Sequence, residues 1–347
     1  MAGAIPRIAA GVLIVLLLLV VAGAAIASPS ATTSDASDAS IAALEQLLSQ
    51  PEGQIDLARA KVTIDHMVDP KVDVEATLRQ VDQWAAKTRA RFPAGASNKV
   101  KMHLLISTLY EPGPWNDHRP FGYDYTDPFG QDVKKSLLSH YFATRNGQCV
   151  IMPIAFLVIG QRLGLPLTIT TAPYHLIVKY GDEEQRQWTN FEATSGLFHP
   201  DSGYEQAMSI PLEATRNDTF LRPFSQRETV ALFATASLLP SYQQKKQAER
   251  ILTATSLILK ANPKDVTAMV VRGDAYYLLI EQQFKAKYPK AGQIPQALRA
   301  EYAEYSRQNL AWYERAEALG WRQWGQTEKQ RYLRHFNSMK AQSQGGS

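Results

Sequence analysis

The only cysteine of the chain, Cys149, comes directly before an apolar run that predicts a buried helix. Asn146, Gly147 and Gln148 precede it and predict a turn. The first turn of a helix presents free N–H groups and a partial positive charge, which favour the nucleophilic thiolate over the thiol. The same N–H groups can bind the oxyanion of an acyl-transfer transition state. Cys149 is therefore a candidate nucleophile; the alternative is a buried, inert cysteine.

A thiol nucleophile needs a base and a group that orients the base. His175 opens a predicted strand over 175–180, and Glu192 ends the next predicted strand, over 187–192. The charged segment 181–186 between them predicts a hairpin turn, which would place both side chains on paired strands with Cβ atoms about 5 Å apart. A helix-borne cysteine facing a histidine and an acid is the arrangement that nucleophilic catalysis requires. The alternative is a solvated histidine and a solvated carboxylate at two strand ends.

Four further residues near these positions are secondary candidates. Gln148 could donate its amide to the oxyanion, although it also suits a turn. Asn190 lies two residues before Glu192 on the same strand face and is a second candidate to orient the histidine. Tyr174 and Trp188 could line a groove for the acyl donor, although aromatic residues beside strands often belong to the core.

The remaining acidic residues and histidines do not predict a metal site. The aspartates between 117 and 132 do not have the spacing of an EF-hand loop, and the histidines have no zinc-ligand spacing. A single cysteine also excludes an internal disulfide. We expect neither a metal nor an organic cofactor.

The elements that would position these residues indicate an α+β fold, in which a helix packs on a small antiparallel sheet. A long loop is expected over 110–132, and from residue 225 the pattern becomes all-helical, with tetratricopeptide-like spacing of small and aromatic residues. The predicted helices before Cys149 span 41–50, 73–92, 99–109 and 133–144, the strands span 167–171, 175–180 and 187–192, and the later helices span 226–239, 243–261, 264–287 and 296–319. The helical region contains fewer repeats than a free-standing solenoid needs, so it should pack on the α+β domain.

The amino terminus predicts export. Residues 8–27 carry no charge, follow Arg7 and end in a small-x-small pattern, which is typical of a bacterial signal peptide; the alternative is an uncleaved membrane anchor. The mature protein would then be periplasmic or secreted. Because the net charge is only +4 and the basic residues are scattered, nucleic acid is not an expected partner.

The residues Gly147-Gln148-Cys149 before an apolar helix, His175 at a strand start, and Trp188 to Thr194 resemble the transglutaminase-like superfamily. The resemblance is closer to its SirB-type bacterial branch, which joins a papain-like domain to tetratricopeptide-like helices. It implies an exported thiol enzyme, a cysteine protease or other hydrolase, or an acyltransferase acting on a peptide or carboxamide through Cys149, His175 and Glu192. Glutamate stands where the superfamily usually has aspartate, and many SirB-type proteins lack a nucleophile.

We therefore predict five segments and two candidate functions. The segments are a signal peptide or anchor (1–27), a flexible linker (28–40), a transglutaminase-like domain (41–224), a helical domain (225–335) and a polar tail (336–347). The first function is acyl transfer or hydrolysis on a protein or peptide substrate. The alternative is an inactive envelope scaffold that binds peptides. In either case the helical domain could bind a protein partner.

Overall fold

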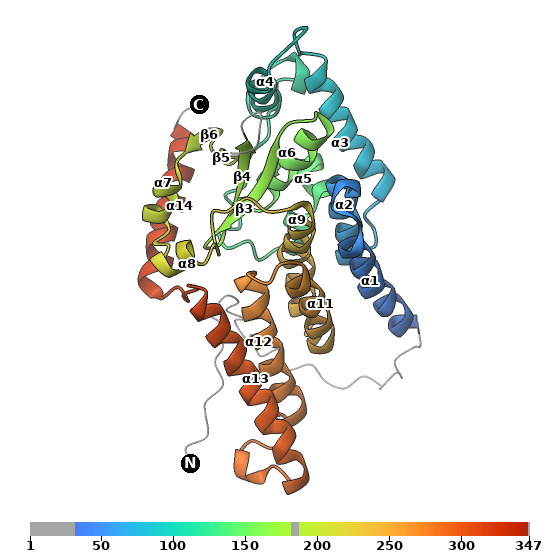
Figure 1. The fold of residues 1–347 in the computed structure, drawn as a ribbon, viewed down its shortest axis with the longest axis vertical. Coiled ribbons are helices and arrows are strands. Elements are labelled where there is room, and N and C mark those ends of the chain that lie inside the picture. Colours follow the sequence, from blue (N-terminus) through green and yellow to red (C-terminus); the bar gives the residue numbers. More distant parts are fainter. Residues whose placement is uncertain (1–31, 182–186, 346–347) are drawn as a thin grey trace.

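The computed structural model describes residues 32–181 and 187–345 and combines many helices with a small sheet (Figure 1). This confirms the predicted α+β fold followed by a helical region. In chain order the helices and strands are α1 (Thr32–Ser49), α2 (Leu57–Val68), α3 (Val74–Arg89), α4 (Asn98–Tyr110), β1 (Gly122–Tyr123), α5 (Leu138–Thr144), β2 (Asn146–Gly147), α6 (Ile151–Arg162), β3 (Leu167–Ala172), β4 (His175–Gly181), β5 (Trp188–Glu192), β6 (Leu197–His199), α7 (Asp201–Ala207), α8 (Leu212–Arg216), α9 (Gln226–Phe233), α10 (Leu239–Gln244), α11 (Ala248–Ala261), α12 (Val266–Ile280), α13 (Arg299–Ala318) and α14 (Gln326–Gly345).

Strands β3 to β6 form an antiparallel sheet in sequential order, and α6 packs against β3 and β4. The three predicted strands lie within one residue of their expected bounds. The three-residue β6 extends the sheet beyond them and was not predicted, because so short a segment carries no alternating pattern. Strands β1 and β2 form a separate parallel pair that leads directly into the segment before α6.

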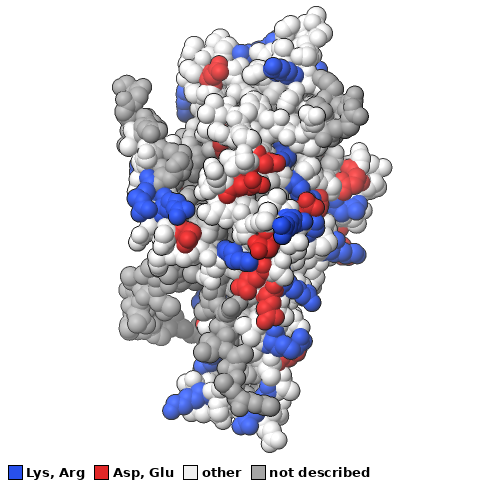
Figure 2. Space-filling model, turned by 60° about the vertical axis from the view of Figure 1, so that its left-hand side comes forward, with Lys and Arg blue, Asp and Glu red and all other residues white. Residues whose placement is uncertain are grey.

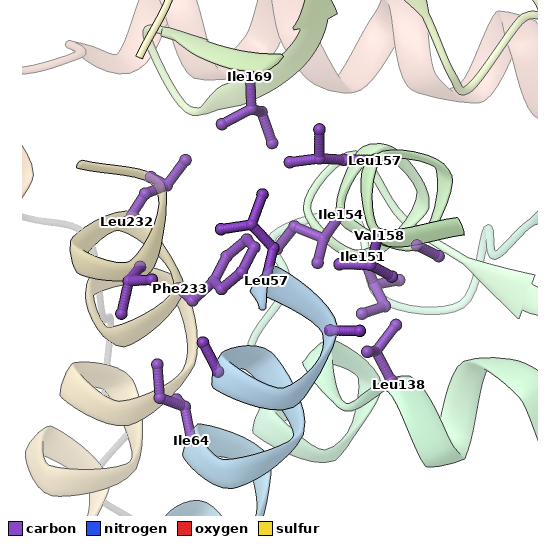
Figure 3. Close-up of a cluster of buried hydrophobic side chains, with 14 of the residues drawn as sticks. Leu57, Ile64, Leu138, Ile151, Ile154, Leu157, Val158, Ile169, Leu232 and Phe233 are labelled. Carbon is purple, nitrogen blue, oxygen red and sulfur yellow. The ribbon is translucent and has the colours of Figure 1, made fainter. Parts of the chain in front are cut away.

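The hydrophobic core is continuous from the amino-terminal helices through α6 to the later helical region. Figure 3 shows Leu57 of α2 between Ile154 of α6 and Phe233 of α9. All three side chains are almost fully buried. Each such side chain contributes about 1.5–3 kcal/mol to folding relative to an exposed one. The helical region therefore packs on the α+β domain, as expected, and shares its core.

The structure gives more helix at both ends of the chain than the sequence predicted. Helix α1 begins at Thr32 and not at 41, so residues 32–40 are not a flexible linker. The segment predicted as a polar tail from residue 336 belongs to α14, which runs through Gly345. Small and polar residues predict a linker or tail when packing partners are not visible in the sequence. The predicted signal peptide and residues 28–31 lie outside the described residues.

The helices of the carboxy-terminal region are less regular than predicted. The predicted helix 226–239 becomes α9 and α10 with the π-helical segment Ala234–Leu238 between them. A second π-helical segment, Glu281–Lys285, ends α12. Helices α12 and α13 pack closely at Gly273, where an added Cβ would lie 3.0 Å from the Tyr313 ring and 3.2 Å from a backbone oxygen. A larger residue at this crossing would therefore require its neighbours to move by a few tenths of an ångström.

A fully buried ion pair joins three parts of the chain. Lys61 and Asp65, one helical turn apart in α2, contact each other inside the core. The ammonium of Lys61 also donates to the Ser136 carbonyl (2.8 Å) and to the Ser237 hydroxyl (3.1 Å). Asp65 accepts from the backbone N–H of Leu138 (2.8 Å). The pair thus ties α2 to the segment around α5 and to the later helical region.

The surface carries charges of both signs. On the face drawn in Figure 2, Lys and Arg alternate with Asp and Glu, without a continuous basic stripe. Within the residues that the structure describes, no helix combines the length and the hydrophobicity needed to span a membrane.

Candidate active site

Cys149 lies in the turn between β2 and α6. Its half-buried thiol donates a weak hydrogen bond to the carbonyl of Tyr174, with Sγ 3.8 Å from the oxygen. In the described part of the chain, the backbone N–H groups of Cys149 and Val150 have no hydrogen-bond partner. Two donors at the start of a helix are therefore free beside the thiol, as an oxyanion site requires.

The turn before the thiol requires glycine. An added Cβ at Gly147 would lie 2.6 Å from the ring of Tyr141 and 2.7 Å from Ile151. Real atoms do not approach so closely, so any larger residue would displace the turn. The backbone oxygen of Gly147 also accepts from Asp124 (2.7 Å), which ties the turn to the loop after β1. The glycine before Cys149 therefore serves to place the thiol.

His175 is presented by a tight hairpin between β3 and β4. Ala172 pairs with His175, which leaves Pro173 and Tyr174 as the two turn residues. Tyr174 has a φ of 59°, in the left-handed region that bulky residues rarely adopt. This backbone conformation aims the Tyr174 carbonyl at Cys149 and starts β4 at the histidine. The strain is thus stored directly beside the thiol, as is common at functional sites.

Glu192 reaches the imidazole from the neighbouring strand. Its Oε2 lies 2.6 Å from Nε2 of His175. Val178 pairs with Phe191, so the register continued by one step places Glu192 opposite Ile177 and diagonal to His175. The sequence suggested that the two residues are directly opposite each other, whereas the structure places them diagonally. The Cβ atoms of a diagonal pair are farther apart than those of a direct pair. Glutamate, which is one methylene longer than aspartate, can therefore span this distance.

Three further groups hold the Glu192 carboxylate. The backbone N–H and the hydroxyl of Thr194 donate to Oε1, at 3.1 and 2.6 Å. The hydroxyl of Tyr204, from α7, donates to Oε2 at 3.0 Å. Neither residue was predicted as part of the site. Thr194 lies within the motif, whereas Tyr204 lies in a different element and no local pattern marks it.

The charges of the site stabilise each other. Burial lowers the pKa of His175, but Glu192 and Cys149 together outweigh it and raise that pKa to about 10. Burial likewise raises the pKa of Glu192, and the ring of His175 and the bonds from Thr194 outweigh it and lower that pKa to about 2. Near neutral pH the pair is therefore imidazolium and carboxylate. Because Glu192 occupies Nε2, the nitrogen left for the thiol is Nδ1.

The two candidate amides are bonded elsewhere. The side-chain amide of Gln148 donates to the backbone oxygens of Asp127 and Asp124 and so holds the loop after β1. The amide of Asn190 donates to Asp201 (2.6 Å). Gln148 therefore supports the turn that carries the thiol, and the His175 ring is oriented by the glutamate and not by Asn190.

The two candidate aromatic residues lie at opposite ends of the sheet. Tyr174 is 53% exposed and adjoins both Cys149 and His175. Trp188 pairs with Gly181, four residues along β5 from Glu192. At about 3.3 Å per residue this separates them by about 13 Å. The structure therefore places Tyr174 at the site and Trp188 away from it.

No group of three or more histidine, cysteine, aspartate or glutamate side chains is arranged to hold a metal ion within the described ranges.

Comparison with known protein families supports the predicted resemblance of the region around Cys149, His175 and Glu192 to the transglutaminase-like superfamily. Residues 75–233 match the family model Transglut_core2, the transglutaminase-like superfamily. No curated protein matches the chain. Among solved structures, the chain is similar to that described as "Crystal structure of menin reveals the binding site for Mixed Lineage Leukemia (MLL) protein", with 14% identity and a TM-score of 0.47 over 82% of this chain and 70% of that one. This similarity is too weak to assign a fold or a function.

Proposed function

We propose that this protein, whose residues 75–233 form a transglutaminase-like domain, is a thiol enzyme that transfers or hydrolyses acyl groups. The observation that carries the proposal is the connected series of Cys149, His175 and Glu192 at the start of a buried helix. A histidine of raised pKa, held by a buried carboxylate and in contact with a half-buried thiol, is the arrangement of a thiolate–imidazolium pair.

The reaction follows from these positions. In the resting pair the proton of the Cys149 thiol is held on Nδ1 of His175, and the resulting thiolate attacks a carboxamide or peptide carbonyl. The oxyanion formed is bound by the free backbone N–H of Cys149. The carbon–nitrogen bond then breaks, the imidazolium protonates the leaving amine, and a thioester remains on the sulfur. Water as acceptor completes hydrolysis, whereas an amine completes cross-linking.

Glu192 acts on this sequence through His175. Its carboxylate stabilises the imidazolium and holds the ring so that Nδ1 faces the sulfur. Thr194 and Tyr204 keep the carboxylate in place and supply the hydrogen bonds that a buried charge needs. The proposed substrate is a protein or peptide, in keeping with the exposed aromatic side chain of Tyr174 beside the thiol.

The proposal is tested by thiol reactivity and by turnover. Because Cys149 is the single cysteine, iodoacetamide labelling followed by intact mass reports on this residue alone. The native protein should label rapidly at about pH 6, where an ordinary thiol with a pKa of about 8.5 is almost fully protonated. His175→Ala should abolish this advantage, and the exposed-site control His118→Ala should retain it.

Turnover is measured as release of ammonia from glutamine peptides, and as incorporation of a fluorescent amine into a glutamine-rich protein. Both signals should disappear in Cys149→Ala. Equal and slow labelling of the native and His175→Ala proteins would instead favour the alternative, an inactive scaffold that binds peptides.

We also propose that the enzyme works outside the bacterial cytoplasm, in the periplasm or after secretion, on the basis of the apolar segment 8–27. The uncleaved alternative would anchor it to the inner membrane. Mass analysis of the protein recovered from its native host decides between the two, since cleavage after Ala27 removes that segment.

A further inference from the structure

Aromatic side chains surround the thiol on two sides. Tyr123 belongs to β1, which pairs with the strand that ends two residues before Cys149. Tyr174 directly precedes His175 and accepts the thiol hydrogen bond on its carbonyl. With Tyr125 and Phe129 of the loop after β1, these residues form what we call the aromatic cradle. Phe129 is 49% exposed, so one edge of the cradle faces solvent.

The carboxy-terminal segment fills this cradle. The ring of Trp324 lies 4.3 Å from that of Tyr174, measured between centroids. The ring of Phe336 lies 5.6 Å from Tyr125 and 6.2 Å from Tyr123, and Phe336 is only 2% exposed. A surface helix thus buries its largest apolar side chain against the residues that flank the thiol.

Tyr332 completes the contact. It is one helical turn before Phe336, so both side chains lie on one face of α14. Its ring is 5.8 Å from Phe129, and its hydroxyl donates to the backbone oxygen of Pro128 (2.6 Å). Burial, together with the nearby Cys149, raises the pKa of the Tyr332 phenol. On the same helix, Gln330 and Arg331 are exposed.

We propose that the aromatic cradle is the substrate-binding subsite, that it takes aromatic side chains of a peptide, and that the segment Trp324–Phe336 is its intramolecular occupant. This inference rests on the proposed function of Cys149. The segment Trp324–Phe336, which we call the cover, leaves the thiol half-buried. It therefore excludes a peptide, while a small molecule still reaches the sulfur. A substrate must displace three aromatic side chains and one hydroxyl hydrogen bond, contacts that are individually modest.

The test compares reagents of two sizes on the full chain. Trp324→Ala/Tyr332→Ala removes two contacts of the cover, and Gln330→Ala/Arg331→Ala is the matched control on the same helix. The first variant should react with a bulky dye-maleimide roughly tenfold faster than the native protein, with little change toward iodoacetamide. The control should match the native protein with both reagents. Equal maleimide rates in all three proteins would overturn the proposal.

A peptide added in trans tests the subsite itself. A synthetic peptide of residues 324–336 should slow maleimide labelling of the Trp324→Ala/Tyr332→Ala variant, and the same peptide with its aromatic residues replaced by alanine should not. Equal effects of the two peptides would refute the aromatic preference.

A second measurement needs no substitution and therefore does not depend on the folding of a variant. Attachment of the bulky maleimide to native Cys149 should expel the cover and so reduce hydrogen-exchange protection in α14 but not in α13. Unchanged protection in α14 would contradict the proposal. The two proposals can fail separately. Equal iodoacetamide labelling of the native and His175→Ala proteins would refute the proposed enzyme activity. Equal maleimide labelling of the native and Trp324→Ala/Tyr332→Ala proteins would refute the proposed occupancy of the aromatic cradle.

Discussion

Replacement of the Glu192 carboxylate by its amide, Glu192→Gln, removes the charge that acts on His175 and preserves the shape of the side chain. The amide oxygen can still accept from Thr194, but an N–H₂ group then faces the imidazole or the hydroxyl of Tyr204. Without the carboxylate, burial works against the charged ring, and the pKa of His175 falls from about 10 toward its ordinary range near 6.5.

The magnitude follows from the pKa of the carboxyl group. A fall from the ordinary 4.5 to about 2 corresponds to about 3 kcal/mol, because each tenfold change in a protonation equilibrium equals about 1.36 kcal/mol. We therefore expect Glu192→Gln to lower the free energy of unfolding by about 3 kcal/mol at pH 7. The control substitution Glu213→Gln, at an exposed position, should change the free energy of unfolding by less than about 0.5 kcal/mol.

The pH dependence has a defined sign on each side. The lowered pKa of Glu192 gives stability that is complete above 4.5 and lost as the pH falls through about 2. The raised pKa of His175 gives stability that is complete below 6.5 and lost as the pH rises through about 10. Native stability should therefore be greatest between about pH 4.5 and 6.5, and its excess over Glu192→Gln should shrink on both sides.

The assays are urea unfolding and iodoacetamide labelling of Cys149 across the pH range. At about pH 6 the Glu192→Gln protein should label roughly tenfold more slowly than the native protein, because loss of the imidazolium removes the thiolate. Superimposable labelling and stability profiles for the two proteins would refute the electrostatic account of the site.

Three other substitutions test particular contacts. Tyr204→Phe removes one donor to the buried carboxylate and should cost about 1.5–3 kcal/mol in urea unfolding, with slower labelling at acidic pH; an unchanged midpoint would exclude that hydrogen bond. Lys61→Met leaves Asp65 buried without its cation and should cost about 3–5 kcal/mol, whereas a loss below about 1 kcal/mol would show that the ion pair is not maintained. Gly320→Ala would place Cβ 2.5 Å from backbone atoms at a φ of 95° and should lower the melting temperature further than Gly95→Ala, which has a φ of 69° and open space; equal losses would contradict the close contact.

The parts of the site that share one short pattern could be predicted from the sequence. Cys149 before an apolar helix, His175 as the first residue of one strand, and Glu192 as the last residue of the next strand are each specified by residues within a few positions of them. The structure brings these three side chains into contact. The diagonal relation of His175 to Glu192 depends on strand register, which composition does not fix.

The parts that depend on distant packing could not be predicted. Tyr204 contributes only its hydroxyl group to the site, from the seven-residue helix α7. Trp188 belongs to the sequence motif that ends at Thr194, but it lies at the end of β5 that is distant from Glu192. Helix α14 is polar along most of its length, so its sequence resembles a tail until Phe336 is seen buried beside Tyr125. In each case the decisive partner is far away in the sequence.

The continuity of the core sets the smallest fragment that can fold. The family match begins at residue 75, but Leu57 and Ile64 of α2 lie inside the core and α11 contributes Ile251 and Ile258. A fragment cut at residues 75 and 233 would lose these inner layers and expose apolar faces to water. The region that carries Cys149, His175 and Glu192 should consequently melt together with its flanking helices in one cooperative transition, and residues 75–233 alone should not fold stably.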